Sequence, residues 1–157
     1  MEKIIKEMKS ISAVMGFMGV FQVFKLLEYF QAMKVLDAAA VSAMGMMDLG
    51  EMVPMDTILP IVKGVGMVPL VVCILFHLIL CIKGFKEAND PSPAKFHIVL
   101  AVLGLICYVL AAVSTGAGLF DGVGDLIPEL LDTVIAAACA VLLYYYVKNA
   151  RQIRTAE

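Results

Sequence analysis

Long apolar segments, separated by short polar ones, run the length of the chain. Four stretches contain no Asp, Glu, Lys or Arg: Ser10–Phe24, Gly64–Ile82, Phe96–Phe120 and Thr133–Val147. A helix needs about 20 apolar residues to cross a hydrocarbon core of roughly 30 Å. With their apolar flanks, these stretches predict an all-α polytopic membrane protein whose four spans form a transmembrane-helix bundle. We place the spans near 8–31, 57–83, 96–119 and 129–149 in a single membrane domain over residues 1–157.

The connections between the predicted spans are short. Gly84 and the Pro91-Ser92-Pro93 segment punctuate the second connection, and glycines follow the third span. The first connection is the longest, and its apolar part, Val35 to Met47, is too short to cross a bilayer. We therefore expect a short interfacial or re-entrant helix between spans one and two.

Composition supports a membrane location. Hydrophobic residues make up 62% of the 157 residues and charged residues 17%, against about 45–50% and 25% in ordinary soluble domains. A small soluble domain cannot bury that much apolar surface. The net charge of −2 includes no basic excess that would bind nucleic acid. The four cysteines lie in apolar stretches, so a disulfide framework is not indicated.

The basic residues predict the orientation of the chain. Nine of the 12 precede span one, separate spans two and three, or follow span four: Lys3, Lys6, Lys9, Lys83, Lys86, Lys95, Lys148, Arg151 and Arg154. The acidic residues Asp37, Asp48, Glu51, Asp56, Asp121, Asp125 and Glu129 gather on the opposite side. Because basic loops stay inside, both termini are expected in the cytoplasm of a multi-pass integral membrane protein.

The sequence predicts neither an enzyme nor a bound cofactor. It contains no G-x-S-x-G, H-E-x-x-H or phosphate-binding loop. The connections are also too short to hold a catalytic domain outside the membrane.

Four charged residues within the spans are the candidate transport or gating site. Lys63, Asp132, Glu28 and Lys25 all fall toward the outer leaflet of the predicted bundle. Ionisable residues in a membrane span are expensive and suggest function, so these side chains are candidates for a polar vestibule. The alternative is that each side chain snorkels outward to water without forming a site.

A metal site is a weaker hypothesis. Cys73, His77 and Cys81 recur at every fourth residue and share one helix face, a spacing that permits two or three ligands to one metal. No second histidine belongs to this motif, which favours ordinary packing, in which the cysteines are small apolar residues and His77 bonds a neighbouring carbonyl. We therefore predict no metal at this position.

Small residues mark faces along which helices can approach closely. Ser12, Gly16 and Gly19 form one such stripe in span one, suited either to a homo-oligomer or, as we favour, to packing within the bundle. The bilayer is the expected environment, and a second copy or another membrane protein the expected partner. The function predicted is an oligomeric channel or carrier for ions or small solutes. The alternative is a non-catalytic accessory or scaffold subunit of a larger membrane complex.

Overall fold

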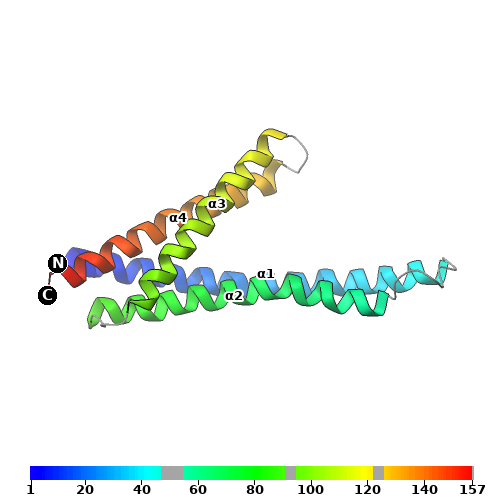
Figure 1. Cartoon of the computed structure of the whole chain (residues 1–157), viewed down its shortest axis with the longest axis horizontal. Coiled ribbons are helices and arrows are strands. Elements are labelled where there is room, and N and C mark those ends of the chain that lie inside the picture. Colours follow the sequence, from blue (N-terminus) through cyan, green and yellow to red (C-terminus); the bar gives the residue numbers. More distant parts are fainter. Residues whose placement is uncertain (47–54, 91–94, 122–125, 157) are drawn as a thin grey trace. The chain divides into compact units, whose positions relative to one another are not determined.

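The computed structural model is all-helical and describes residues 1–46, 55–90, 95–121 and 126–156 (Figure 1). Its helices are α1 (Glu2–Met46), α2 (Met55–Asn89), α3 (Phe96–Asp121) and α4 (Leu126–Thr155). Each contains a stretch long and apolar enough to cross a membrane. The predicted number and order of the spans are thus confirmed as helices.

The helices extend beyond the predicted spans. α1 continues through residues 32–46, where the sequence predicted the end of span one and a separate short helix over Val35 to Met47. The reason is local, because Gln31 to Met44 contains good helix formers and neither glycine nor proline. α2 likewise runs through Pro60 and Pro69 without interruption. Of the acidic outer residues, Asp48, Glu51 and Asp125 lie outside the described residues.

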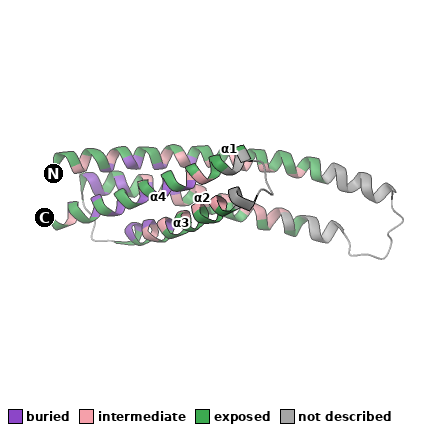
Figure 2. Cartoon of the chain, turned by 90° about the horizontal axis from the view of Figure 1, so that it is seen from above, coloured by how far each residue is buried: buried purple, intermediate pink, exposed green. Residues whose placement is uncertain are grey.

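The chain divides into two compact units. The terminal unit comprises Met1–Gly16 and Ile79–Glu157, and the hairpin unit comprises Phe17–Leu78. Every buried apolar side chain among the described residues belongs to the terminal unit (Figure 2). The core of that unit is built from the start of α1, the end of α2 and the facing sides of α3 and α4.

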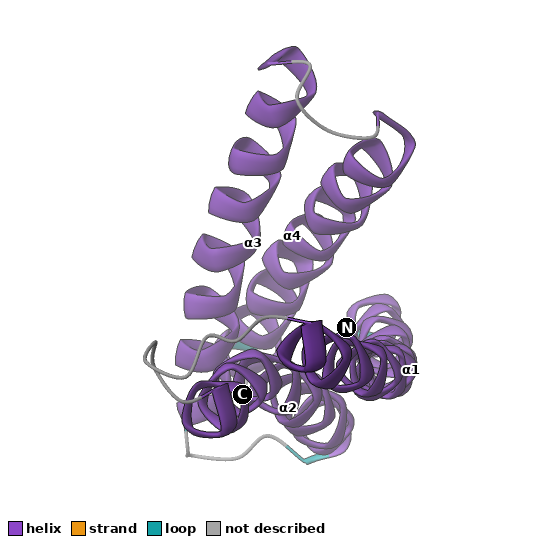
Figure 3. Ribbon diagram, turned by 90° about the vertical axis from the view of Figure 1, so that its right-hand side faces the viewer, coloured by secondary structure: helices purple, strands orange, loops and turns teal. Residues whose placement is uncertain are grey.

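Within the terminal unit, α3 and α4 pack side by side and antiparallel (Figure 3). At one end the Thr133 hydroxyl donates to the Thr115 hydroxyl at 2.9 Å. At the other end the rings of His97 and Tyr146 meet edge to face, with centroids 6.1 Å apart. The two chain termini lie together at this second end of the unit (Figure 1).

Close approach of α1 and α2 depends on small residues. In the terminal unit, a Cβ atom added to Gly84 would lie 2.1 Å from Ser12 Oγ and 2.7 Å from Tyr146 Cε2. One added to Gly16 would lie 2.8 Å from Cys81 Sγ. In the hairpin unit, Gly19 packs against His77 and Leu78. The stripe of small residues in span one is therefore an intramolecular seam, as favoured from the sequence.

We expect Gly84→Ala to destabilise the protein, because the added methyl group would overlap side chains from two other helices. Overpacking of this kind costs about 1–3 kcal/mol. Gly64→Ala is the matched control, since no atom lies within 4 Å of its added Cβ and alanine favours helix. Thermal unfolding in detergent should show a lower midpoint for the first variant only. An equal midpoint in both variants would refute the close packing.

Candidate functional site

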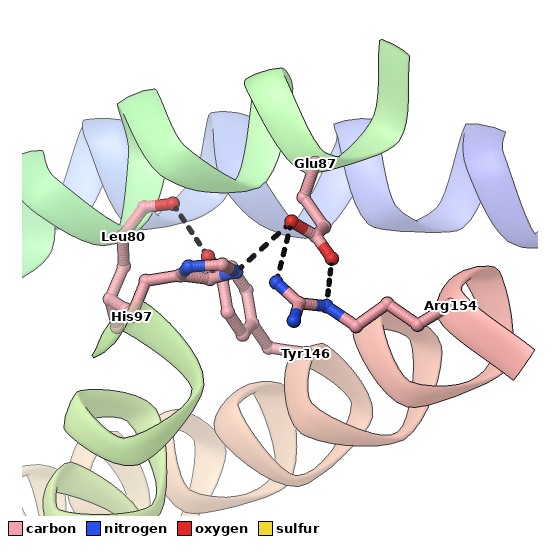
Figure 4. A network of polar contacts seen from close by, with 5 residues as sticks. All are labelled: Leu80, Glu87, His97, Tyr146 and Arg154. Carbon is pink, nitrogen blue, oxygen red and sulfur yellow. Dashed lines mark hydrogen bonds and ion pairs between the residues drawn. The ribbon is translucent and has the colours of Figure 1, made fainter. Parts of the chain in front are cut away.

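A buried cluster of ionisable side chains joins three helices in the terminal unit (Figure 4). Glu87 comes from the last turns of α2, His97 from the first turn of α3 and Arg154 from the last turn of α4. The side chain of Glu87 is 0% exposed, that of His97 3% and that of Arg154 16%. The side chains of Glu87 and His97 are thus shielded from water, whereas that of Arg154 is partly exposed.

The Glu87 carboxylate and the Arg154 guanidinium pair through two parallel contacts. Arg154 Nε donates to Glu87 Oε1, and Arg154 Nη2 donates to Oε2 at 3.0 Å. A bidentate pair of this kind is among the stronger polar contacts in proteins and fixes the relative orientation of its partners. It therefore links the ends of α2 and α4.

His97 lies beside this pair. Its Nε2 is 3.5 Å from Glu87 Oε2, close enough for charge interaction, but it makes no hydrogen bond with the described residues. The contact between His97 and Glu87 is therefore electrostatic and not a formed hydrogen bond. A protonated imidazole at this position would place a second cation on Glu87.

Tyr146 and Gly84 pack against each other next to the cluster. The Tyr146 hydroxyl donates to the Leu80 carbonyl at 3.2 Å, and its ring is fully buried. Leu80, Gly84 and Glu87 are spaced to share one face of α2, so the same face binds Tyr146 and carries the carboxylate. Close by in the sequence of α4, the buried Asn149 has an amide nitrogen, Nδ2, without a hydrogen bond to the described residues.

The four predicted gating residues lie elsewhere. Lys25, Glu28 and Lys63 belong to the hairpin unit, and Asp132 belongs to the terminal unit. Lys25 and Lys63 are half-buried, whereas Glu28 and Asp132 are exposed. The backbone carbonyl of Lys63 accepts a hydrogen bond from the Tyr29 hydroxyl at 3.0 Å. The polar vestibule that these residues suggested remains a prediction.

The candidate metal ligands are engaged in helix packing. His77 Nδ1 donates to the Cys73 carbonyl one turn earlier at 2.7 Å, as expected of a histidine that bonds its own helix. Cys73 Sγ lies 3.9 Å from the same nitrogen. Cys81 belongs to the terminal unit, where its sulfur packs against Gly16. Among the residues whose side chains are described, no group of three or more metal-ligating side chains is found.

Sequence reasoning missed the cluster of Glu87, His97 and Arg154. Glu87 and Arg154 lie beyond the charge-free stretches and were assigned to a connection and to the C-terminal tail, whereas His97 is the second residue of the third stretch. One signal was present: Glu87 follows Leu80 and Gly84 at helical spacing, so a carboxylate continues an apolar face. The three consecutive tyrosines of α4 differ in burial: Tyr144 and Tyr145 are exposed, and Tyr146 is buried.

We predict unequal effects of removing the two members of the ion pair. Arg154→Met leaves a carboxylate buried without its main partner, which costs about 3–5 kcal/mol. Glu87→Gln leaves an arginine whose side chain is already partly exposed, so its cost should be smaller. The double variant should recover part of the stability lost in Arg154→Met. Thermal unfolding of the four proteins in detergent measures these differences, and strictly additive losses would contradict the pairing.

Comparison with known proteins found no counterpart. No family model, no curated protein and no solved structure matches the chain.

Proposed function

We propose that the chain crosses a lipid bilayer four times, with both termini on the cytoplasmic side. The charge-free stretch Gly64–Ile82 of α2 supports the crossing, since its roughly 19 residues span about 28 Å at about 1.5 Å per residue. Lys63 and Lys83 flank this stretch, as expected at the two edges of a hydrocarbon core of about 30 Å. The grouping of both termini in the unit that carries most basic residues supports the orientation.

The orientation predicts which tags a protease can reach. Epitope tags at the N-terminus and at the C-terminus should both resist protease added outside intact cells. Both should be cut after the membrane is permeabilised, because basic segments remain on the cytoplasmic side. Digestion of either tag in intact cells would overturn the orientation.

For this membrane protein we further propose an oligomeric channel or carrier for ions or small solutes. The supporting observation is the buried cluster of Glu87, His97 and Arg154 at the cytoplasmic end of the proposed bundle. Apolar side chains of similar volume would hold three helices together at least as well as a buried ion pair. A set of charges that can be rearranged is better suited to a gate, which must open and close.

The cluster offers a way to open this gate. Protonation would make the imidazole of His97 a cation that competes for the Glu87 carboxylate across 3.5 Å. The Arg154 side chain, which is 16% exposed, could then turn toward water, and water would solvate its charge in place of the carboxylate. Because the guanidinium joins α2 to α4, its release would free the ends of these helices from one another.

Flux through liposomes tests this proposal. Proteoliposomes loaded with KCl should release K⁺ or Cl⁻ at least about tenfold faster with Glu87→Gln than with the unchanged protein, the factor expected when a gate loses about 1.4 kcal/mol. Asp90→Asn is the matched control, since Asp90 is exposed and three residues away. Ion-selective electrodes measure the release. Rates equal to those of empty liposomes for every protein would reject a channel or carrier for these ions.

The accessory or scaffold function remains the second candidate. An exposed stripe of apolar residues along α3 supports it: Leu103, Ile106, Leu110 and Val113, at 52–65% exposure. Their helical spacing gives a continuous face suited to another membrane helix or to lipid. Extraction in mild detergent distinguishes the two functions. A complex with a stoichiometric second protein would favour the scaffold, and a homo-oligomer would favour transport.

A further inference from the structure

A groove in the hairpin unit carries two lysines. It has a volume of about 480 Å³, within the roughly 300–1,000 Å³ range of small-molecule sites. Its lining includes Tyr29, Phe30 and Lys34 from α1 and Pro60, Lys63 and Met67 from α2. Lys34 is exposed and Lys63 half-buried. The groove therefore combines apolar walls with two ammonium groups contributed by different helices.

Tyr29 and two glycines shape the groove. The Tyr29 hydroxyl donates to the Lys63 carbonyl, and a Cβ on Gly66 would lie 2.3 Å from that hydroxyl oxygen. The phenol ring thus packs directly on the backbone of α2, which only a residue without a side chain allows. Gly64 also lines the groove, and nothing lies within 4 Å of the Cβ position there. The groove is consequently closed by the Tyr29 ring at Gly66 and open at Gly64.

The position of the groove along α2 indicates its surroundings. Lys63 immediately precedes the charge-free stretch Gly64–Ile82, so the groove falls where the proposed hydrocarbon core ends. Ile61 and Val65, on either side of Lys63, are 60% and 68% exposed. In a bilayer this depth is that of the phosphate groups of lipids, with acyl chains beginning beside it.

We propose that this groove binds the headgroup of an anionic phospholipid. The two ammonium groups complement the phosphate charge, and Phe30 and Met67 provide apolar surface for the first carbons of the acyl chains. Glu28 precedes Tyr29 in the chain, but it does not line the groove. The proposal requires the chain to lie in a membrane and is independent of whether it transports a solute.

Native mass spectrometry of the purified protein with phosphatidylglycerol tests the proposal. Lys34→Gln and Lys63→Gln should each weaken retention of this lipid about fivefold, the factor equivalent to roughly 1 kcal/mol per lysine near an anionic lipid. The double variant should show about 25-fold weakening if the two effects add. Lys95→Gln, which removes an exposed lysine from the terminal unit, should bind like the unchanged protein.

Three results would overturn the assignment. The first is retention of phosphatidylglycerol by the double variant at the level of the unchanged protein. The second is equal binding of zwitterionic phosphatidylcholine, which would mean that charge has no part in recognition. The third is displacement of the lipid by glycerol phosphate at equal concentration, which would identify a site for a soluble phosphate. Matching thermal unfolding midpoints would show that the variants are folded.

Discussion

The contact at Gly84 is the constraint on which the terminal unit depends. The absence of a side chain there lets Ser12 of α1 and Tyr146 of α4 meet the backbone of α2 at one level. Ser12 can occupy such an apolar junction because its hydroxyl donates to the Met8 carbonyl of its own helix at 2.8 Å. Tyr146 satisfies its hydroxyl on the Leu80 carbonyl. The two hydroxyls at the junction are thus paired, one within α1 and one between α4 and α2, and the rest of the junction is close packing.

This packing determines what the charged cluster can do. Burying a carboxylate is unfavourable unless a partner of opposite charge is held in place, and the partner of Glu87 comes from a helix far away in the sequence. The position of α4 is set about two turns before Arg154, where Tyr146 enters the junction. The ion pair is therefore a consequence of apolar packing rather than its cause. A change in the pair can then move the helix ends while the junction remains.

The helices could be predicted from the sequence because runs without charge have the length that a bilayer requires. Their ends could not, because lysine, glutamate and alanine beyond the runs continue a helix as readily as they form a connection. The small-residue seam at Ser12, Gly16 and Gly19 was foreseeable from spacing alone. The cluster of Glu87, His97 and Arg154 was not, since it depends on which ends of three helices meet, and no local pattern encodes that meeting.

The uninterrupted length of α1 has a consequence for the exposure of its backbone amides to water. Its 45 residues extend about 67 Å at roughly 1.5 Å per residue, whereas a bilayer with its headgroups is about 40–45 Å thick. Fitting the whole helix within that thickness would require a tilt of about 48–53°, more than the 0–40° range of membrane helices. If α1 crosses a bilayer once, part of its length lies outside the bilayer, in the aqueous phase. Its amide protons there would exchange with solvent far sooner than those in the hydrocarbon, so the chain would carry a built-in boundary between two rates of hydrogen exchange.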